Sequence, residues 1–76
     1  MDTIKNYQNL ANAIILEAVK EWRDAVRRLK RKPNNKQALE EKQSCEDFFL
    51  SEWFDILTDI YGADLLRQLK EEAGID

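Results

Sequence analysis

The sequence contains no histidine, and this absence narrows the chemistry open to the chain. Histidine is the commonest general base, and Cys45, the single cysteine, therefore has no imidazole to activate it. One cysteine also excludes an internal disulfide and disfavours a zinc site. With only Gly62 and Gly74, the chain cannot build a glycine-rich phosphate loop. These absences predict a protein that is not an enzyme and that holds no metal or cofactor.

The sequence also lacks a long hydrophobic run. The longest apolar stretch, residues 10–19, is interrupted by Asn12 and Glu17 and is shorter than the roughly 18 residues that a membrane span needs. The first ten residues have no basic segment followed by an apolar one, so they do not resemble a secretory signal. A lone cysteine is typical of a reducing compartment. We therefore expect no membrane association and a cytoplasmic location.

What is present fits a small folded protein. Of 76 residues, 43% are hydrophobic and 36% are charged, which is neither a disordered nor a membrane composition. The length predicts a single helical domain over residues 1–76. A chain of this size has difficulty burying enough apolar surface alone, so we expect self-association to complete its core.

Apolar residues recur at steps of three and four in the first part of the chain, which predicts a long helix from about Thr3 to Lys32. Asp2 or Thr3 can cap its start. Pro33 ends it, because the residue before a proline is pushed out of the helical region. The sequence therefore indicates a first helix of about thirty residues with a sharp end.

The remaining sequence favours shorter helices. Asn34 or Asn35 can cap a second helix that reaches about Leu50, and Ser51 favours a bend before a short aromatic helix. Gly62 permits a change of direction before a C-terminal helix that Gly74 closes. The predicted fold is an all-α bundle of three to four helices.

Two segments carry more apolar residues than one helix face can bury. In residues 10–19 apolar side chains occupy most of the circumference of the predicted helix. In residues 48–61 one seam holds Phe49, Trp53, Ile56 and Ile60, and a second holds Leu50, Phe54, Leu57 and Tyr61. Either the two segments pack on each other as the core, which would include Trp22 and Phe49, or one seam remains for a second copy or another protein. The candidate interface residues are Ile14, Leu16, Trp53, Phe54 and Tyr61.

Charge is unevenly distributed along the chain. Residues 1–35 hold eight basic and four acidic residues, a net +4, and residues 36–76 hold four basic and eleven acidic, a net −7, which together give the total of −3. A basic stripe at helical spacing consists of Lys20, Arg23, Arg27 and Arg31. It is either a solvated face that pairs with nearby acids or a binding site for an anionic nucleotide or an acidic protein surface. The net negative charge makes nucleic acid a less favourable partner.

Several short motifs together resemble a group of short phage and prophage proteins of Gram-positive bacteria. The resemblance covers about residues 7–72. Its motifs are Leu10-Ala11-x-Ala13-Ile14, Ala18-Val19-x-x-Trp22-Arg23, Pro33-Asn34-Asn35, Phe48-Phe49-x-Ser51-x-Trp53-Phe54, Leu57-Thr58-Asp59 and Gly62. Tyr61 departs from the pattern, in which an acidic residue precedes the glycine. The resemblance implies a bacterial host cell as the location and an accessory role, such as blocking a host defence by gripping a protein or binding a nucleotide signal.

These observations lead to three functional hypotheses. The first is a non-enzymatic binding protein that inhibits a host anti-phage defence by occupying a protein surface or sequestering an anionic nucleotide. The second is a structural or assembly component of a phage particle or its packaging machinery. The third is a nucleic-acid-binding factor that uses the basic stripe.

Overall fold

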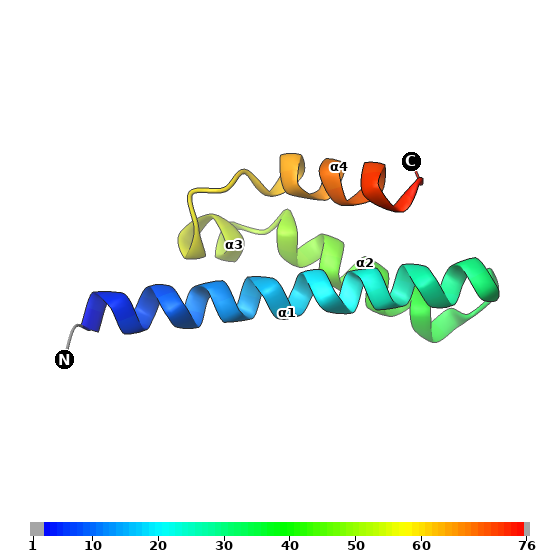
Figure 1. Ribbon diagram of the computed structural model, residues 1–76, viewed down its shortest axis with the longest axis horizontal. Helices are drawn as coiled ribbons and strands as arrows, with labels where there is room; N and C mark the ends of the chain where they lie inside the picture. The colour runs from blue at the N-terminus through cyan, green and yellow to red at the C-terminus, as the bar shows by residue number, and fades with distance from the viewer. Residues whose placement is uncertain (1–2, 76) are drawn as a thin grey trace.

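The computed structural model describes the backbone of residues 3–75 and the side chains of residues 9–75. This part of the chain forms four α-helices and contains no strand. Figure 1 shows how the helices are arranged. The helices are α1 (Thr3–Arg31), α2 (Lys36–Phe49), α3 (Glu52–Leu57) and α4 (Gly62–Ala73). The predicted all-α bundle is therefore confirmed. The cap proposed at Asp2 lies outside the described residues.

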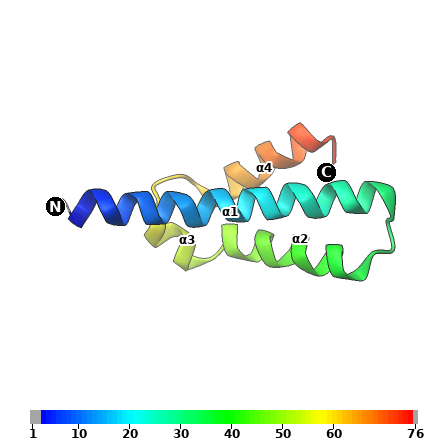
Figure 2. The ribbon, with the colours of Figure 1, turned by 60° about the horizontal axis from the view of Figure 1, so that its bottom comes forward.

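Helix α1 is the axis of the molecule. Its 29 residues correspond to about 43 Å, close to the longest dimension of 47 Å. In both views α2 runs back along the C-terminal half of α1 and α4 packs beside them, while the N-terminal end of α1 extends past α3 (Figures 1 and 2). The bundle is therefore thick at one end of α1 and thin at the other.

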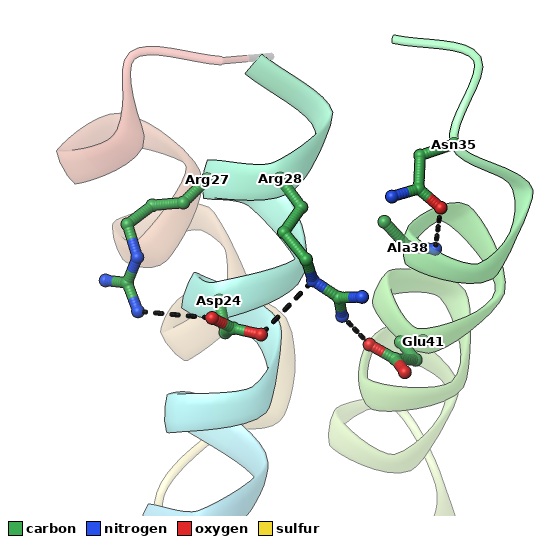
Figure 3. A network of polar contacts seen from close by, with 6 residues as sticks. All are labelled: Asp24, Arg27, Arg28, Asn35, Ala38 and Glu41. Atoms are coloured by element: carbon green, nitrogen blue, oxygen red, sulfur yellow. Dashed lines mark hydrogen bonds and ion pairs between the residues drawn. The ribbon is translucent and has the colours of Figure 1, made fainter. Parts of the chain in front are cut away.

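The α1–α2 turn forms as the sequence predicts. Helix α1 ends at Arg31, two residues before Pro33. The side chain of Asn35 caps α2 by accepting a 3.1 Å hydrogen bond from the amide of Ala38. The capping bond is drawn in Figure 3. Local sequence chemistry alone accounts for this turn.

An ionic network joins the two helices beside the turn. Figure 3 shows Asp24 between Arg27 and Arg28, and Arg28 reaching across to Glu41 on α2. The Arg28 Nε lies 3.2 Å from Asp24 Oδ2 but forms no hydrogen bond with it. The pairing is mainly charge–charge attraction between partly exposed side chains, and such pairs contribute little to stability.

Ser51 separates α2 from α3, as the sequence predicts. Its Oγ accepts a 3.2 Å hydrogen bond from the amide of Phe54, which caps α3, and donates a 2.7 Å bond to the carbonyl of Phe48 at the end of α2. The two bonds satisfy backbone groups that the interrupted helix would otherwise leave unpaired.

The break at Ser51 changes which aromatic residues face inward. Phe49 and Phe54 are fully buried and meet edge to face, with ring centroids 5.9 Å apart, whereas Trp53 is 54% exposed. A continuous helix would instead place Phe49 and Trp53 on one side, which is the seam that the periodicity predicts. The core assignment of Trp22 and Phe49 is confirmed, since both are fully buried.

The expectation that Phe54 is an interface residue is wrong. Its side chain is wholly inside this chain's own core, packed on Phe48 and Phe49, and none of its surface remains for a partner. The helical period that predicts the two seams does not continue through residues 48–61, because Ser51 ends α2 and caps α3.

The two glycines serve different purposes. Gly74 has a φ of 73° and ends α4 in the left-handed conformation, as the sequence predicts. Gly62 begins α4 with its backbone pressed against α2, and a Cβ there would lie 1.8 Å from the carbonyl oxygen of Phe49. The essential property of Gly62 is therefore its missing side chain and not an unusual turn conformation.

None of the helices that the structure describes is long and apolar enough to cross a membrane.

Candidate interaction surfaces

Large apolar side chains are concentrated on the surface at the thin end of the molecule. The exposed ones among the described residues are Leu10, Ile14, Leu16, Leu39, Leu50, Trp53, Ile56, Ile60 and Tyr61. All but Leu39 fall within residues 10–16 of α1 or residues 50–61 around α3. The two views place α3 beside the N-terminal half of α1 (Figures 1 and 2). Clustered exposure of this kind is typical of a surface that binds another molecule.

The segment around α3 contributes the largest share of this surface. We call Leu50, Trp53, Ile56, Ile60 and Tyr61 the α3 surface. All five side chains are more than half exposed, and Tyr61 reaches 67%. Two of the predicted interface residues, Trp53 and Tyr61, belong to it. Their aromatic rings supply apolar area together with a polar atom, a combination enriched at protein interfaces.

The other predicted interface residues, Ile14 and Leu16, are also exposed but cannot belong to one flat patch. Positions two apart on a helix point about 200° apart. Ile14 faces α2 and lines a groove there, and Leu16 does not. The sequence identified both as surplus apolar residues without separating their faces.

We call the groove between α1 and α2 the α1/α2 groove. It is open to solvent, has a volume of about 440 Å³, and is mainly apolar. Its lining consists of Ala13, Ile14, Glu17, Ala18, Glu21, Ser44, Cys45 and Phe48. Burial, and then the negative charges of Glu21 and Glu46, raise the pKa of the Cys45 thiol, so Cys45 acts here as a small apolar residue and not as a nucleophile.

The predicted basic stripe is on the surface. Lys20, Arg23, Arg27 and Arg31 are all exposed. Arg23 donates a 2.9 Å hydrogen bond to Glu72 of α4. Arg27 lies 3.7 Å from Asp24 on its own helix. Both contacts are of the kind that the solvated-face interpretation predicts.

The stripe borders a second, smaller groove between α1 and α4. This groove has a volume of about 250 Å³ and brings Arg23 and Arg27 together with Lys30. Lys30 donates a hydrogen bond to the carbonyl of Ala73 at the C-terminal end of α4. Helix C-termini carry partial negative charge, so α4 already neutralises part of the positive charge of this groove.

One buried polar cluster, which joins α1 to α2, was not predicted from the sequence. The indole Nε1 of Trp22 donates a 2.9 Å hydrogen bond to Glu46 Oε2, and Lys42 Nζ lies 2.7 Å from the same oxygen. Burial raises the pKa of Glu46, but the bonds from Lys42 and Trp22 and the charge of Lys70 outweigh it and lower the pKa overall. The spacing of Lys42 and Glu46 is the only sequence signal for it, and this spacing is common on solvated helices.

Among the described side chains, no cluster of three or more acidic, cysteine or histidine residues is arranged to hold a metal ion.

Comparison with known proteins gives no match: no family model, no curated protein and no solved structure is similar to this chain.

Proposed function

We propose that this chain is a non-enzymatic helical binding protein of the phage accessory type, which inhibits a host defence by occupying the surface of a host protein. The α3 surface is the observation that carries the proposal. Trp53, Ile56 and Tyr61 expose large apolar area within a short stretch of chain, although the same stretch also supplies Phe54 to the core. Exposed aromatic residues at this density lower solubility unless a partner covers them.

The α3 surface also has a suitable geometry for a rigid contact. Ser51 fixes the start of α3 through two hydrogen bonds, and Phe54 anchors the helix in the core, so Trp53 and Ile56 are presented from a defined backbone. A preorganised surface loses less entropy on binding than a flexible one. The acidic neighbours Glu52 and Asp55 favour a partner with basic residues around an apolar patch.

The proposal is tested by phage plating on bacteria that carry anti-phage defence systems. The chain is expected to restore plating against at least one system, and Trp53→Ala combined with Tyr61→Ala should abolish the effect while circular dichroism stays unchanged. Leu39→Ala, an exposed apolar position on α2 away from α3, is the matched control and should keep full activity. A folded double variant with full activity would contradict the proposal. Association of the wild type with purified phage particles, without any effect on defence, would favour an assembly component.

A second candidate, sequestration of an anionic nucleotide, rests on the basic stripe. Within the described part of the chain Lys20 and Arg31 are exposed and take part in no ion pair, so their charges remain available. Calorimetric titration with a cyclic dinucleotide tests this candidate. Binding should weaken as salt rises, and Lys20→Glu with Arg31→Glu should remove it, whereas Lys36→Glu should not. Absence of heat at every salt concentration would exclude this ligand class.

A further inference from the structure

We propose that the α1/α2 groove is the site where two copies of this chain join, each laying the N-terminal half of its α1 antiparallel across the groove of the other. The inference does not depend on the proposed function, because no residue of the α3 surface lines the groove. It specifies the contact that the size of the chain leads us to expect.

The shape of the molecule indicates the occupant. The N-terminal end of α1 extends beyond the other helices (Figures 1 and 2). The α1/α2 groove lies along the last turns of α2, where Ser44, Cys45 and Phe48 line it. The N-terminal end of α1 cannot occupy this groove within one chain, because α1 is a continuous helix that itself forms one wall of the groove. A second copy related by a twofold axis can occupy it, and both protruding ends are then covered at once.

The apolar residues on this face fit such a contact. Leu10 lies one turn before Ile14 on the same side of α1, and the two form an exposed ridge of 62% and 38% exposure. Ala18, Cys45 and Phe48 are the least exposed apolar residues that line the groove. In an antiparallel pair with its axis near Ala13, the ridge of one copy enters the groove of the other. The small side chain of Ala13 permits close approach of the two α1 helices.

Charge complementarity supports the same arrangement. The rim of the groove carries Glu17 and Glu21, and none of the described residues that line it is basic. Lys5 is the only charged residue of the sequence between positions 3 and 16, and the first turn of α1 contains no acid. The N-terminal end of a helix also carries partial positive charge. An antiparallel arrangement therefore places a positive segment over an acidic rim in both halves of the dimer.

The first experiment measures oligomeric state by analytical ultracentrifugation at roughly 100 µM, where even weak interfaces assemble. The wild type should sediment as a dimer. Ile14→Asp should weaken the dimer at least about a hundredfold, because it inserts a charge into a buried apolar contact. Leu39→Asp is the matched control, because Leu39 is an exposed leucine of α2 that does not line the groove, and this variant should leave the dimer intact. A monomeric wild type, or a dimer lost in Leu39→Asp and kept in Ile14→Asp, would overturn the proposal.

The second experiment tests geometry and remains informative if Ile14→Asp fails to fold. Ala13→Cys is introduced with Cys45→Ala, so that the new thiol is the only one in the chain. Near the twofold axis the two Cα atoms should come within the roughly 7 Å that a disulfide allows, and mild oxidation should give a covalent dimer. Asn12→Cys in the same background, exposed on a different face of α1, should cross-link at least about tenfold more slowly. Equal rates for the two variants would contradict the proposed face.

Discussion

Trp22 and Glu46, 24 positions apart in the sequence, are joined by a buried hydrogen bond from the indole Nε1 to the carboxylate oxygen at 2.9 Å. The bond ties the middle of α1 to α2, and Lys42 neutralises the carboxylate from the solvent side. Trp22 therefore contributes both apolar burial and a donor that keeps Glu46 satisfied. A carboxylate with only 8% exposure would otherwise be costly.

The two contributions of Trp22 can be separated by substitution. Trp22→Phe keeps most of the ring but removes the donor, and should lower the free energy of unfolding by about 1 to 3 kcal/mol. Trp22→Ala also creates a cavity, and should cost about 3 to 5 kcal/mol. Urea denaturation measures both values. A Trp22→Phe variant as stable as the parent would show that the hydrogen bond contributes nothing.

The stability of the chain should depend on the ionisation of Glu46. Because its folded-state pKa is lowered, this carboxylate stabilises the fold above its ordinary pKa of 4.5, and the contribution is lost as pH falls through the lower folded value. Glu46→Gln should therefore flatten the acid side of the stability curve. Thermal melts from neutral to acidic pH provide the measurement. Glu40→Gln, an exposed substitution on the same helix, should leave the curve unchanged.

Gly62 should tolerate substitution far less than Gly74. A Cβ at Gly62 would collide with the backbone of Phe49, so Gly62→Ala should displace α4 and cost several kcal/mol, about as much as a large core defect. Gly74→Ala meets no atom and should cost about 1 kcal/mol, the strain of its positive φ. Chemical denaturation of the two variants gives the comparison. Equal losses would mean that α4 does not approach Phe49 this closely.

Ser51 should contribute more to the free energy of unfolding than a serine that caps no helix. Ser51→Ala removes both the acceptor for the Phe54 amide and the donor to the Phe48 carbonyl, and should cost about 0.5 to 2 kcal/mol. Ser44→Ala, an exposed serine within α2, should be neutral or slightly stabilising. Both are measured by thermal denaturation. The proposed α3 surface would also lose order in Ser51→Ala, which hydrogen exchange can detect.

The contact between Arg23 and Glu72 offers a charge-swap test of the basic stripe. Arg23→Glu should weaken the packing of α4 by less than about 1 kcal/mol, because the pair is exposed. Adding Glu72→Arg should restore stability with the charges reversed. If nucleotide binding is also lost in Arg23→Glu but not recovered in the double variant, Arg23 has a role beyond pairing. Full recovery of both properties would assign it to the fold alone.

The helix boundaries were predictable because residues close to each helix end determine where the helix begins or stops. Pro33, Asn35, Ser51 and Gly74 each act within a few residues, and the structure places the α1, α2 and α4 boundaries close to the predicted positions. The aromatic seams were mispredicted at Phe54, since a helical period cannot be carried through a capped break. No local rule reveals whether such a break rotates the next helix inward or outward.

The contacts on the surfaces were harder to predict from the sequence than the helices. Periodicity found surplus apolar residues and a row of cations, but the pairing of Arg23 with Glu72 spans 49 positions. The burial of Glu46 likewise depends on Trp22 of another helix. Such contacts depend on how helices cross, which a single sequence does not encode in any short pattern. The candidate grooves could only be located once the helices were assembled.

The close approach at Gly62 also bears on the search for relatives. Any chain that keeps the start of α4 against the carbonyl of Phe49 must keep a glycine here, whatever it binds. A glycine shared at this position would thus report common architecture and say nothing about a common target. Differences within the α3 surface, where no packing constraint applies, would be the informative ones for tracing how related chains acquire distinct partners.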